Sequence, residues 1–157
     1  MEDLKFSVSG VQFLCSFEGF GAKPYFDPAS GNLPITIGYG TTRYPNGNMV
    51  KMSDPEITQA QGEAYLSDFV NNRVAPVING LMAQLTQWQF DALCSLCYNI
   101  GVGAFAASSV RRAVLKGDYT NIAAYFALWN KGNGKILEGL VKRRAAEAKL
   151  FLTGEYC

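Results

Sequence analysis

The chain of 157 residues contains no histidine. Histidine is the base of Ser-His-Asp and Cys-His catalysis and a frequent ligand of zinc, so its absence excludes those hydrolases and most zinc enzymes. Neither sign of charge predominates, because 14 basic and 13 acidic residues leave a formal net charge of only +1. A chain with so little net charge is not steered to nucleic acid as a whole, and we predict no nucleic-acid partner.

Long hydrophobic runs are absent as well. The uncharged stretch from Phe6 to Phe17 is interrupted by serine, glycine and glutamine. It is too short and too polar to span a bilayer or to act as a membrane anchor. We therefore expect no stable membrane insertion and interpret this stretch as a helix capped by Ser7 or Ser9.

The few cysteines do not form a disulfide pattern. Cys94 and Cys97 have the spacing of a redox motif or of half a zinc site, but Cys15 and Cys157 supply no second pair. We interpret Cys94 and Cys97 as small core residues of a buried helix. The sequence therefore predicts no metal, no other cofactor and synthesis in a reducing cytosol.

Patterning predicts an α+β fold that is mainly helical. In residues 23–52, turn-forming residues interrupt short apolar runs, which predicts a small antiparallel sheet with turns at 27–32 and 44–48. The chain beyond this region is predicted to be wholly helical. Capping boxes that begin at Thr58 and Thr86 each open a helix, and Pro76 predicts a kink or an early end in the first of these helices.

The expected organisation is a single domain with two lobes. A small lobe covers about residues 10–57, a linking helix about 58–78 and a helical lobe about 79–157. We expect a cleft between the lobes to accept a polymer. The predicted helices are residues 7–17, 58–78, 86–101, 109–116, 121–130 and 137–152.

Glu18 and Asp27 are the two carboxylates best suited to catalysis. Glu18 follows an apolar helix, and the helix dipole together with Phe17 and Phe20 should raise the pKa of its carboxyl. Asp27 begins an Asp-Pro turn, where a carboxylate is easily kept ionised. Glycoside hydrolysis needs one protonated and one ionised carboxylate. Glu18 could equally be an ordinary surface charge at a helix end, and Asp27 could equally be an ordinary turn residue. The spacing of the two carboxylates alone therefore does not show whether they are catalytic.

The residues around these carboxylates form a longer series of motifs. They are Glu18-Gly19, Tyr25-Phe26-Asp27, Thr36-Ile37-Gly38-Tyr39-Gly40, the segment 86–105, Gly139-Leu140-Val141 with Arg143-Arg144, and the C-terminal Ala-Glu-x-x-Leu-Phe-Leu. In this order, and across nearly the whole chain, the series resembles the phage lysozymes of glycoside hydrolase family 24. Two features depart from the family: the segment between Asp27 and Thr36 is longer than is common, and Thr41 stands where relatives often have histidine.

The resemblance implies a lysozyme-like fold and a muramidase activity on bacterial peptidoglycan. Glu18 would be the general acid for the β-1,4 bond between N-acetylmuramic acid and N-acetylglucosamine. Asp27 would hold the attacking water or stabilise the transition state, with Thr36 helping to place the water. The resemblance favours inversion, although the separation of the carboxylates decides the outcome. The implied substrate contacts are Tyr39, Thr42, Tyr98, Asn99 and Ser108, but Tyr98 also fits an apolar helix face and Ser108 also fits a helix N-cap.

The resemblance also implies a biological setting. A phage or prophage endolysin would be made in the host cytoplasm as a monomer and would reach the cell wall after a holin permeabilises the membrane. Two alternatives stay open. A lytic transglycosylase cleaves the same bond and needs only one acidic residue, whereas a wall-binding or virion module on a lysozyme scaffold needs neither carboxylate.

Overall fold

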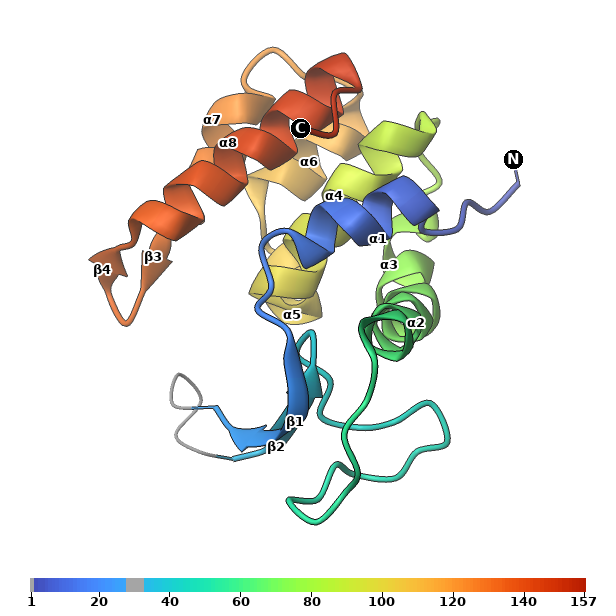
Figure 1. Ribbon diagram of the computed structural model, residues 1–157. Coiled ribbons are helices and arrows are strands. Elements are labelled where there is room, and N and C mark those ends of the chain that lie inside the picture. The colour runs from blue at the N-terminus through green and yellow to red at the C-terminus, as the bar shows by residue number, and fades with distance from the viewer. Residues whose placement is uncertain (1, 28–32) are drawn as a thin grey trace. The chain divides into compact units, whose positions relative to one another are not determined.

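The computed structural model describes residues 2–27 and 33–157 (Figure 1). This part of the chain forms two compact units. The small unit is residues 11–70, and the large unit is residues 2–10 together with residues 71–157. Apart from Asp27, the predicted turn at 27–32 lies outside the described residues. The mainly helical α+β class is confirmed.

The first helix, α1 (Val8–Cys15), crosses from the large unit into the small one. Ser7 is its N-cap, because the Gly10 amide donates a hydrogen bond to the Ser7 hydroxyl at 2.9 Å. The helix ends at Cys15 and not at the predicted Phe17. Single turns continue the chain to Glu18, whose amide donates to the Cys15 carbonyl at 3.2 Å.

The small unit holds an antiparallel pair, β1 (Gly21–Phe26) and β2 (Ile35–Gly38). Tyr25 lies opposite Thr36, and the register is irregular between Gly21 and Tyr25. Pro24 falls in this irregular step, where its missing N–H breaks no regular ladder bond. β1 thus begins three residues after Glu18, and its pairing with β2 places Tyr25 beside Thr36.

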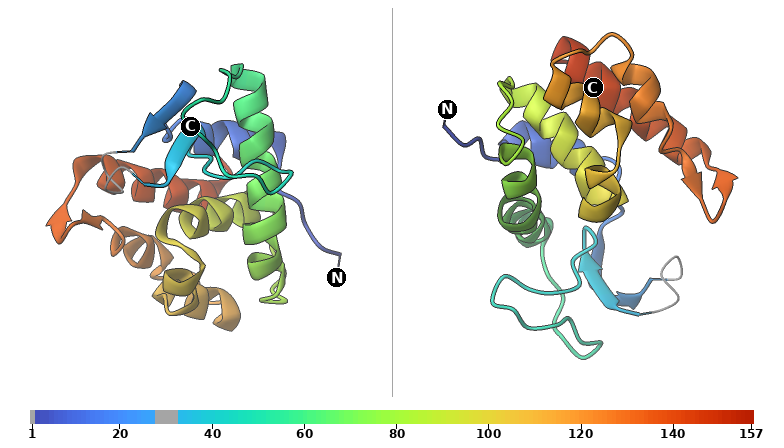
Figure 2. Two further views of the ribbon diagram at one scale, coloured as in Figure 1. Left: turned by 90° about the horizontal axis from the view of Figure 1, so that it is seen from below. Right: turned by 180° about the vertical axis from the view of Figure 1, so that it is seen from behind.

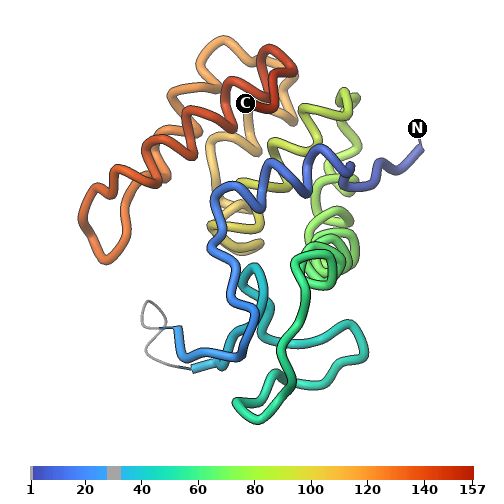
Figure 3. Tube along the Cα trace, viewed as in Figure 1, coloured from blue at the N-terminus to red at the C-terminus, as the bar shows by residue number. Residues whose placement is uncertain are grey.

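Between β2 and the next helix the chain runs as long loops (Figure 3). The predicted turn at 44–48 is confirmed, because the Tyr44 amide donates to the Asn48 carbonyl at 2.9 Å. The run predicted around residues 49–52 is reduced to one bridge, between Arg43 and Met49. Buried apolar side chains still give these loops a core, which consists of Ile37, Val50 and Ile57 with Phe20, Ile35, Tyr44 and Tyr65 packed against it.

A helical run closes the small unit and enters the large one. It consists of α2 (Gln59–Phe69), the π-helical η2 (Val70–Val74) and α3 (Ala75–Asn79). The predicted capping box at Thr58 is confirmed. Pro76 lies in the first turn of α3 and has no N–H to donate to the preceding turn, so the regular α-helical pattern gives way to a wider turn before it.

In the large unit, α4 (Gln87–Ile100) and α8 (Glu138–Thr153) lie side by side (Figures 1 and 2). The capping box at Thr86 opens α4, as predicted. Cys94 and Cys97 are free and buried in α4, which confirms their interpretation as core residues. Three shorter helices complete the unit: α5 (Val102–Ala106), α6 (Ser109–Lys116) and α7 (Ile122–Ala127).

The prediction of a wholly helical chain after residue 58 is wrong at one place. β3 (Lys131–Gly132) and β4 (Lys135–Ile136) form a short hairpin, and α7 ends three residues earlier than expected. Asn133 and Gly134 have φ angles of 51° and 77°, which a two-residue hairpin loop requires. The Asn-Gly pair was the sequence signal for this turn. Within the described residues no helix is long and apolar enough to cross a membrane.

Candidate active site

Glu18 and Asp27 line the same pocket of the small unit. The pocket has a volume of about 380 Å³. Both side chains are partly buried, so neither is a fully solvated surface charge. The structure thus brings together the two carboxylates that the sequence singled out. The other described residues that line the pocket are Gly19, Phe20, Gly21, Tyr25 and Gly40.

The turns after α1 place Glu18 at this pocket. The Phe17 ring packs edge-on against Phe13, with ring centres 5.1 Å apart, which anchors the segment just before Glu18. The chain then enters β1 through Gly19. Because β1 starts only three residues after Glu18, the helix end and the strand that leads to Asp27 form adjacent walls of one site.

Tyr25 lines the same pocket but was not predicted to be a site residue. Burial raises the pKa of its hydroxyl, and the negative charges of Asp27 and then Glu18 raise it further. At neutral pH the Tyr25 hydroxyl therefore stays protonated and can donate a hydrogen bond near both carboxylates. Its place in the Tyr-Phe-Asp motif was a signal that could have identified it.

The thiol of Cys15 lies in the same negative surroundings. Burial raises its pKa to about 12, and the charges of Glu63 and Glu18 contribute to the increase. A thiol of this kind stays protonated and is a poor nucleophile at neutral pH. In the described part of the chain, no three His, Cys, Asp or Glu side chains gather as a metal site. Among the described residues that line the pocket, the groups able to exchange protons are the carboxyl groups of Glu18 and Asp27 and the hydroxyl group of Tyr25.

Thr36 is not among the residues that line the pocket. Only 3% of its surface is exposed, and its hydroxyl donates to the Pro34 carbonyl at 3.2 Å. It is the cross-strand partner of Tyr25. Thr36 thus contacts the site through the strand pair that carries Tyr25.

Tyr39 and Thr42 belong to the same unit. Tyr39 is buried, with its ring centre 5.1 Å from that of Phe20, and its hydroxyl accepts a hydrogen bond from Gln59 at 3.2 Å. The ring therefore supports the pocket wall formed by Phe20. Thr42 is partly buried, and its carbonyl accepts the Val50 amide at 3.0 Å.

The remaining predicted contacts lie in the large unit. Tyr98 and Asn99 occupy the last turn of α4, where Tyr98 is partly buried and Asn99 is exposed. The Asn99 side-chain oxygen accepts a hydrogen bond from Arg144 at 2.8 Å, which leaves its NH₂ group to donate elsewhere. Ser108 is buried and is the N-cap of α6, with its hydroxyl accepting the Arg111 amide at 3.1 Å.

A buried ion-pair network holds Arg144 in this position. Glu147 is fully buried and lies 2.8 Å from the Arg144 Nε and 3.2 Å from the Arg143 Nε. The Ser95 hydroxyl of α4 donates to it at 2.5 Å. Burial raises the pKa of the Glu147 carboxyl, and the charges of both arginines oppose that shift. The network therefore links α8 to the end of α4 that carries Asn99.

Comparison with known proteins places the chain among phage proteins. Residues 15–147 match the sequence profile of the family described as phage lysozyme. The chain is 39% identical over 152 residues to the endolysin of Bacillus phage B103, covering 97% of this chain and 56% of that protein. It is 36% identical over 152 residues to the endolysin of Salmonella phage P22, covering 96% of this chain and 99% of that protein.

A solved structure of another phage endolysin is also similar to this chain. The endolysin from Escherichia coli O157:H7 phage FAHEc1 superposes with a TM-score of 0.86 at 35% identity, covering 99% of this chain and 98% of that one. Against the Bacillus phage endolysins, by contrast, the chain spans just over half of their length, 56% in both cases.

Proposed function

The chain belongs to the phage lysozyme family, and on that premise we propose that it is an endolysin that hydrolyses bacterial peptidoglycan. The bond cleaved is the β-1,4 link between N-acetylmuramic acid and N-acetylglucosamine. The observation that carries the proposal is the shared pocket, in which Glu18 and Asp27 are both partly buried.

In the proposed reaction Glu18 is the general acid. Its carboxyl gives a proton to the glycosidic oxygen as the C1–O bond breaks and positive charge develops on the sugar ring. Asp27 holds a water on the opposite face, takes a proton from it as its oxygen bonds to C1, and opposes the ring's positive charge. This single displacement inverts the configuration at C1.

Tyr25 and Thr36 act around this pair. The protonated Tyr25 hydroxyl is a donor close to both carboxylates, and it orients Asp27 or a sugar oxygen. Thr36 is a positioning residue, because it is buried and paired with Tyr25 across the strands. We assign the glycan contacts beyond the reacting bond to Thr42, Tyr98 and Asn99, of which the exposed Asn99 offers an NH₂ group already oriented by Arg144. The buried Tyr39 and Ser108 act as positioning residues, Tyr39 by packing against Phe20 and Ser108 as the N-cap of α6.

The test is mass spectrometry of the fragments released from purified peptidoglycan. We compare the wild type with Glu18→Gln and with Glu138→Gln, a matched change on the exposed surface of α8. The wild type and Glu138→Gln should release muropeptides with reducing N-acetylmuramic acid ends. Glu18→Gln should lower the rate by at least about a hundredfold, since general acid catalysis contributes that much.

Other products would reject the proposal in different ways. Anhydro-muramic ends would identify a lytic transglycosylase, in which Asp27 is dispensable. No release by any variant, with binding to the wall retained, would identify a binding module. Nuclear magnetic resonance of the first-formed anomer tests the stereochemistry, and the β-anomer would show retention instead of inversion.

The proposed setting is lysis of a host cell. We propose that the protein accumulates in the host cytoplasm as a monomer and reaches the wall when a holin opens the membrane. Fractionation of producing cells before and after addition of a membrane-permeabilising agent tests this setting. Lysis that begins without permeabilisation would contradict it.

A further inference from the structure

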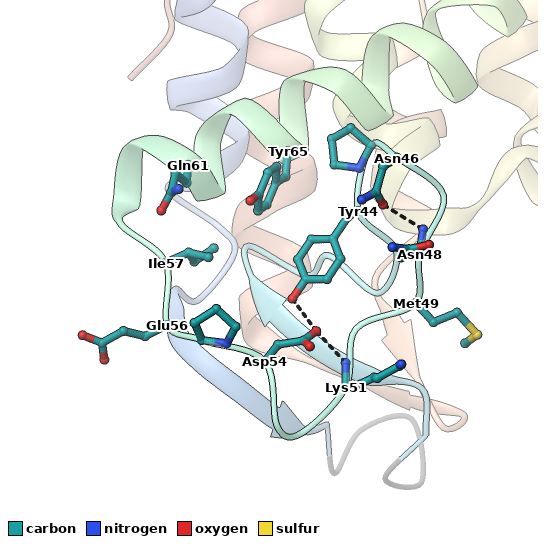
Figure 4. Close-up of a pocket in the computed structure, with 12 residues that line it drawn as sticks. Tyr44, Asn46, Asn48, Met49, Lys51, Asp54, Glu56, Ile57, Gln61 and Tyr65 are labelled. Atoms are coloured by element: carbon teal, nitrogen blue, oxygen red, sulfur yellow. Dashed lines mark hydrogen bonds between the residues drawn. The ribbon is translucent and has the colours of Figure 1, made fainter.

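The small unit contains a second, larger pocket of about 720 Å³ (Figure 4). Its walls come from the loops between β2 and α2 and from the first two turns of α2. Among the described residues, none lines both this pocket and the pocket of Glu18 and Asp27. The residues that line it include Tyr44, Asn48, Met49, Asp54, Gln61 and Tyr65.

Side-chain contacts fix the walls of this pocket. The rings of Tyr44 and Tyr65 meet edge-on, with their centres 5.6 Å apart. The Tyr44 hydroxyl donates to the Asp54 carboxylate at 2.8 Å, and the same carboxylate oxygen accepts the Lys51 amide at 2.9 Å (Figure 4). Both tyrosines also pack on the buried core of the unit. The pocket is therefore formed before any ligand arrives.

Three of the polar groups in the pocket are neutral and available to a ligand. Within the described residues, the Asn48 side-chain amide, the Gln61 NH₂ group and the Tyr65 hydroxyl have no hydrogen-bond partner in the protein. Amides and phenols donate and accept hydrogen bonds without carrying charge. They match the hydroxyl and acetamido groups of an N-acetylated sugar.

Charge does not favour an ionic ligand. The Asp54 carboxylate is already held by two donors. Lys51 and Glu56 are exposed and of opposite sign, and the Glu56 carboxylate points away from the Tyr44 ring (Figure 4). The apolar part of the wall includes the Tyr65 ring and the exposed Met49, which suit the C–H face of a sugar.

We propose that this pocket is a second binding site for the N-acetylated glycan strand of peptidoglycan, separate from the site of bond cleavage. The identity of the polymer rests on the proposed function. The volume suits a few sugar units. A second contact on the same polymer raises the effective concentration of the enzyme at an insoluble substrate.

The direct test is titration with tetra-N-acetylchitotetraose, followed through backbone amide resonances. Two groups of amides should shift, one around residues 18–27 and one within 44–65. Tyr65→Phe keeps the ring contact with Tyr44 but removes the free hydroxyl, so it should weaken binding at the second group about fivefold. Tyr125→Phe is the matched control, because Tyr125 is also partly buried but lies in the large unit.

Three results of this titration would contradict a second glycan site. Shifts confined to the first group, or an equal effect of both phenylalanine variants, would overturn the proposal. A response of residues 44–65 to a free stem peptide and not to the chito-oligosaccharide would also overturn it, in favour of a peptide site. Because binding is read without turnover, the result does not depend on whether the chain cleaves peptidoglycan.

Retention on purified, insoluble peptidoglycan tests the consequence. Met49→Ala combined with Asn48→Ala should lower retention about three- to tenfold. Met52→Ala is the control, since Met52 is exposed on the same loop but does not line the pocket. Cleavage of short soluble fragments should stay unchanged in the double variant. Equal retention of the double variant and the wild type would show that the pocket does not bind the polymer.

Discussion

At the scale of single residues, the shape of the carboxylate pocket depends on a missing side chain. A Cβ on Gly21 would lie 2.6 Å from Cε1 of Tyr25, which is closer than such atoms approach. Glycine at this position therefore lets the Tyr25 ring cover the start of its own strand. A Cβ on Gly139, in α8 of the large unit, would meet nothing within 4 Å.

These two glycines make a matched pair for mutation. Gly21→Ala should displace the Tyr25 ring from the pocket and lower the rate of peptidoglycan cleavage about tenfold or more, because small displacements in an active site are costly. Gly139→Ala should leave the rate close to that of the wild type. Turbidity loss of a peptidoglycan suspension measures both. Equal rates for the two variants would show that the position of the Tyr25 ring does not matter.

The same residues show what the sequence could and could not predict about the site. Glu18 and Asp27 were predicted because helix end, turn and motif are local in the chain. The position of Tyr25 depends on an irregular step in the register between Gly21 and Tyr25. Such a step is set by strand pairing and by the close approach of a ring to a glycine, and local periodicity carries no signal for it.

At the scale of elements, α8 carries two kinds of ion pair. Glu147 is fully buried between Arg143, Arg144 and the Ser95 hydroxyl of α4. Glu138 pairs with Lys142 on the surface at 3.3 Å, where both side chains are largely exposed. Removing one partner of a buried pair leaves charges without compensation, whereas an exposed pair contributes little.

Glu147→Ala should therefore lower the free energy of unfolding by about 3–5 kcal/mol. Glu138→Ala, on the same helix, should be indistinguishable from the wild type. Urea unfolding followed by circular dichroism measures both variants. A small effect of Glu147→Ala would mean that the arginines find water or other partners, and that the network does not fix α8 against α4.

Elements with strong local signals were predicted well. The capping boxes at Thr58 and Thr86 and the glycine after α6 mark helix ends by hydrogen bonds within a few residues. The β3–β4 hairpin was missed because its strands have only two residues each, too few to show alternation. The short α5 falls between the predicted helices 86–101 and 109–116, because Gly101 before it and Gly103 within it are typical of a helix end.

At the scale of the large unit, Asp91 joins distant parts of the chain. This fully buried carboxylate of α4 accepts hydrogen bonds from the Ser7 amide at 3.2 Å, from the Ser7 hydroxyl and from the Tyr156 hydroxyl at 2.7 Å. Gln87 donates to it at 3.0 Å. The first and last segments of the chain are thus held by one side chain.

Replacing that carboxylate should loosen both segments together. Asp91→Ala leaves several partly buried donors without an acceptor and should cost about 2–4 kcal/mol of unfolding free energy. Amide hydrogen exchange should increase near Ser7 and near Tyr156 in the same variant. Asp3→Asn, an exposed change in the same N-terminal segment, is the control. Faster exchange at one segment alone would show that Asp91 does not couple them.

For the whole molecule, buried hydroxyls and thiols predict a loss of stability in alkali. Burial and then the hydrogen bond to Asp91 raise the pKa of Tyr156 from 10.0 to about 12. Burial and then the bond to Asp54 raise that of Tyr44 to about 12 as well. Burial raises the pKa of the Cys97 thiol from 9.0 to about 12. At a pH between the ordinary pKa of each group and its raised pKa in the folded protein, the group has lost its proton in the unfolded chain but keeps it in the folded chain.

The unfolded state then binds fewer protons than the folded state, so the free energy of unfolding must fall as pH rises. Urea titrations at intervals from about pH 8 to about pH 11 should give a plateau below about pH 9 and a progressively steeper fall above it. Tyr156→Phe removes one of these groups. It should therefore be less stable than the wild type near neutral pH but lose stability less steeply in alkali. An unchanged slope in this variant would mean that the Tyr156 hydroxyl titrates alike in the folded and unfolded chain, and that its bond to Asp91 does not hold the proton.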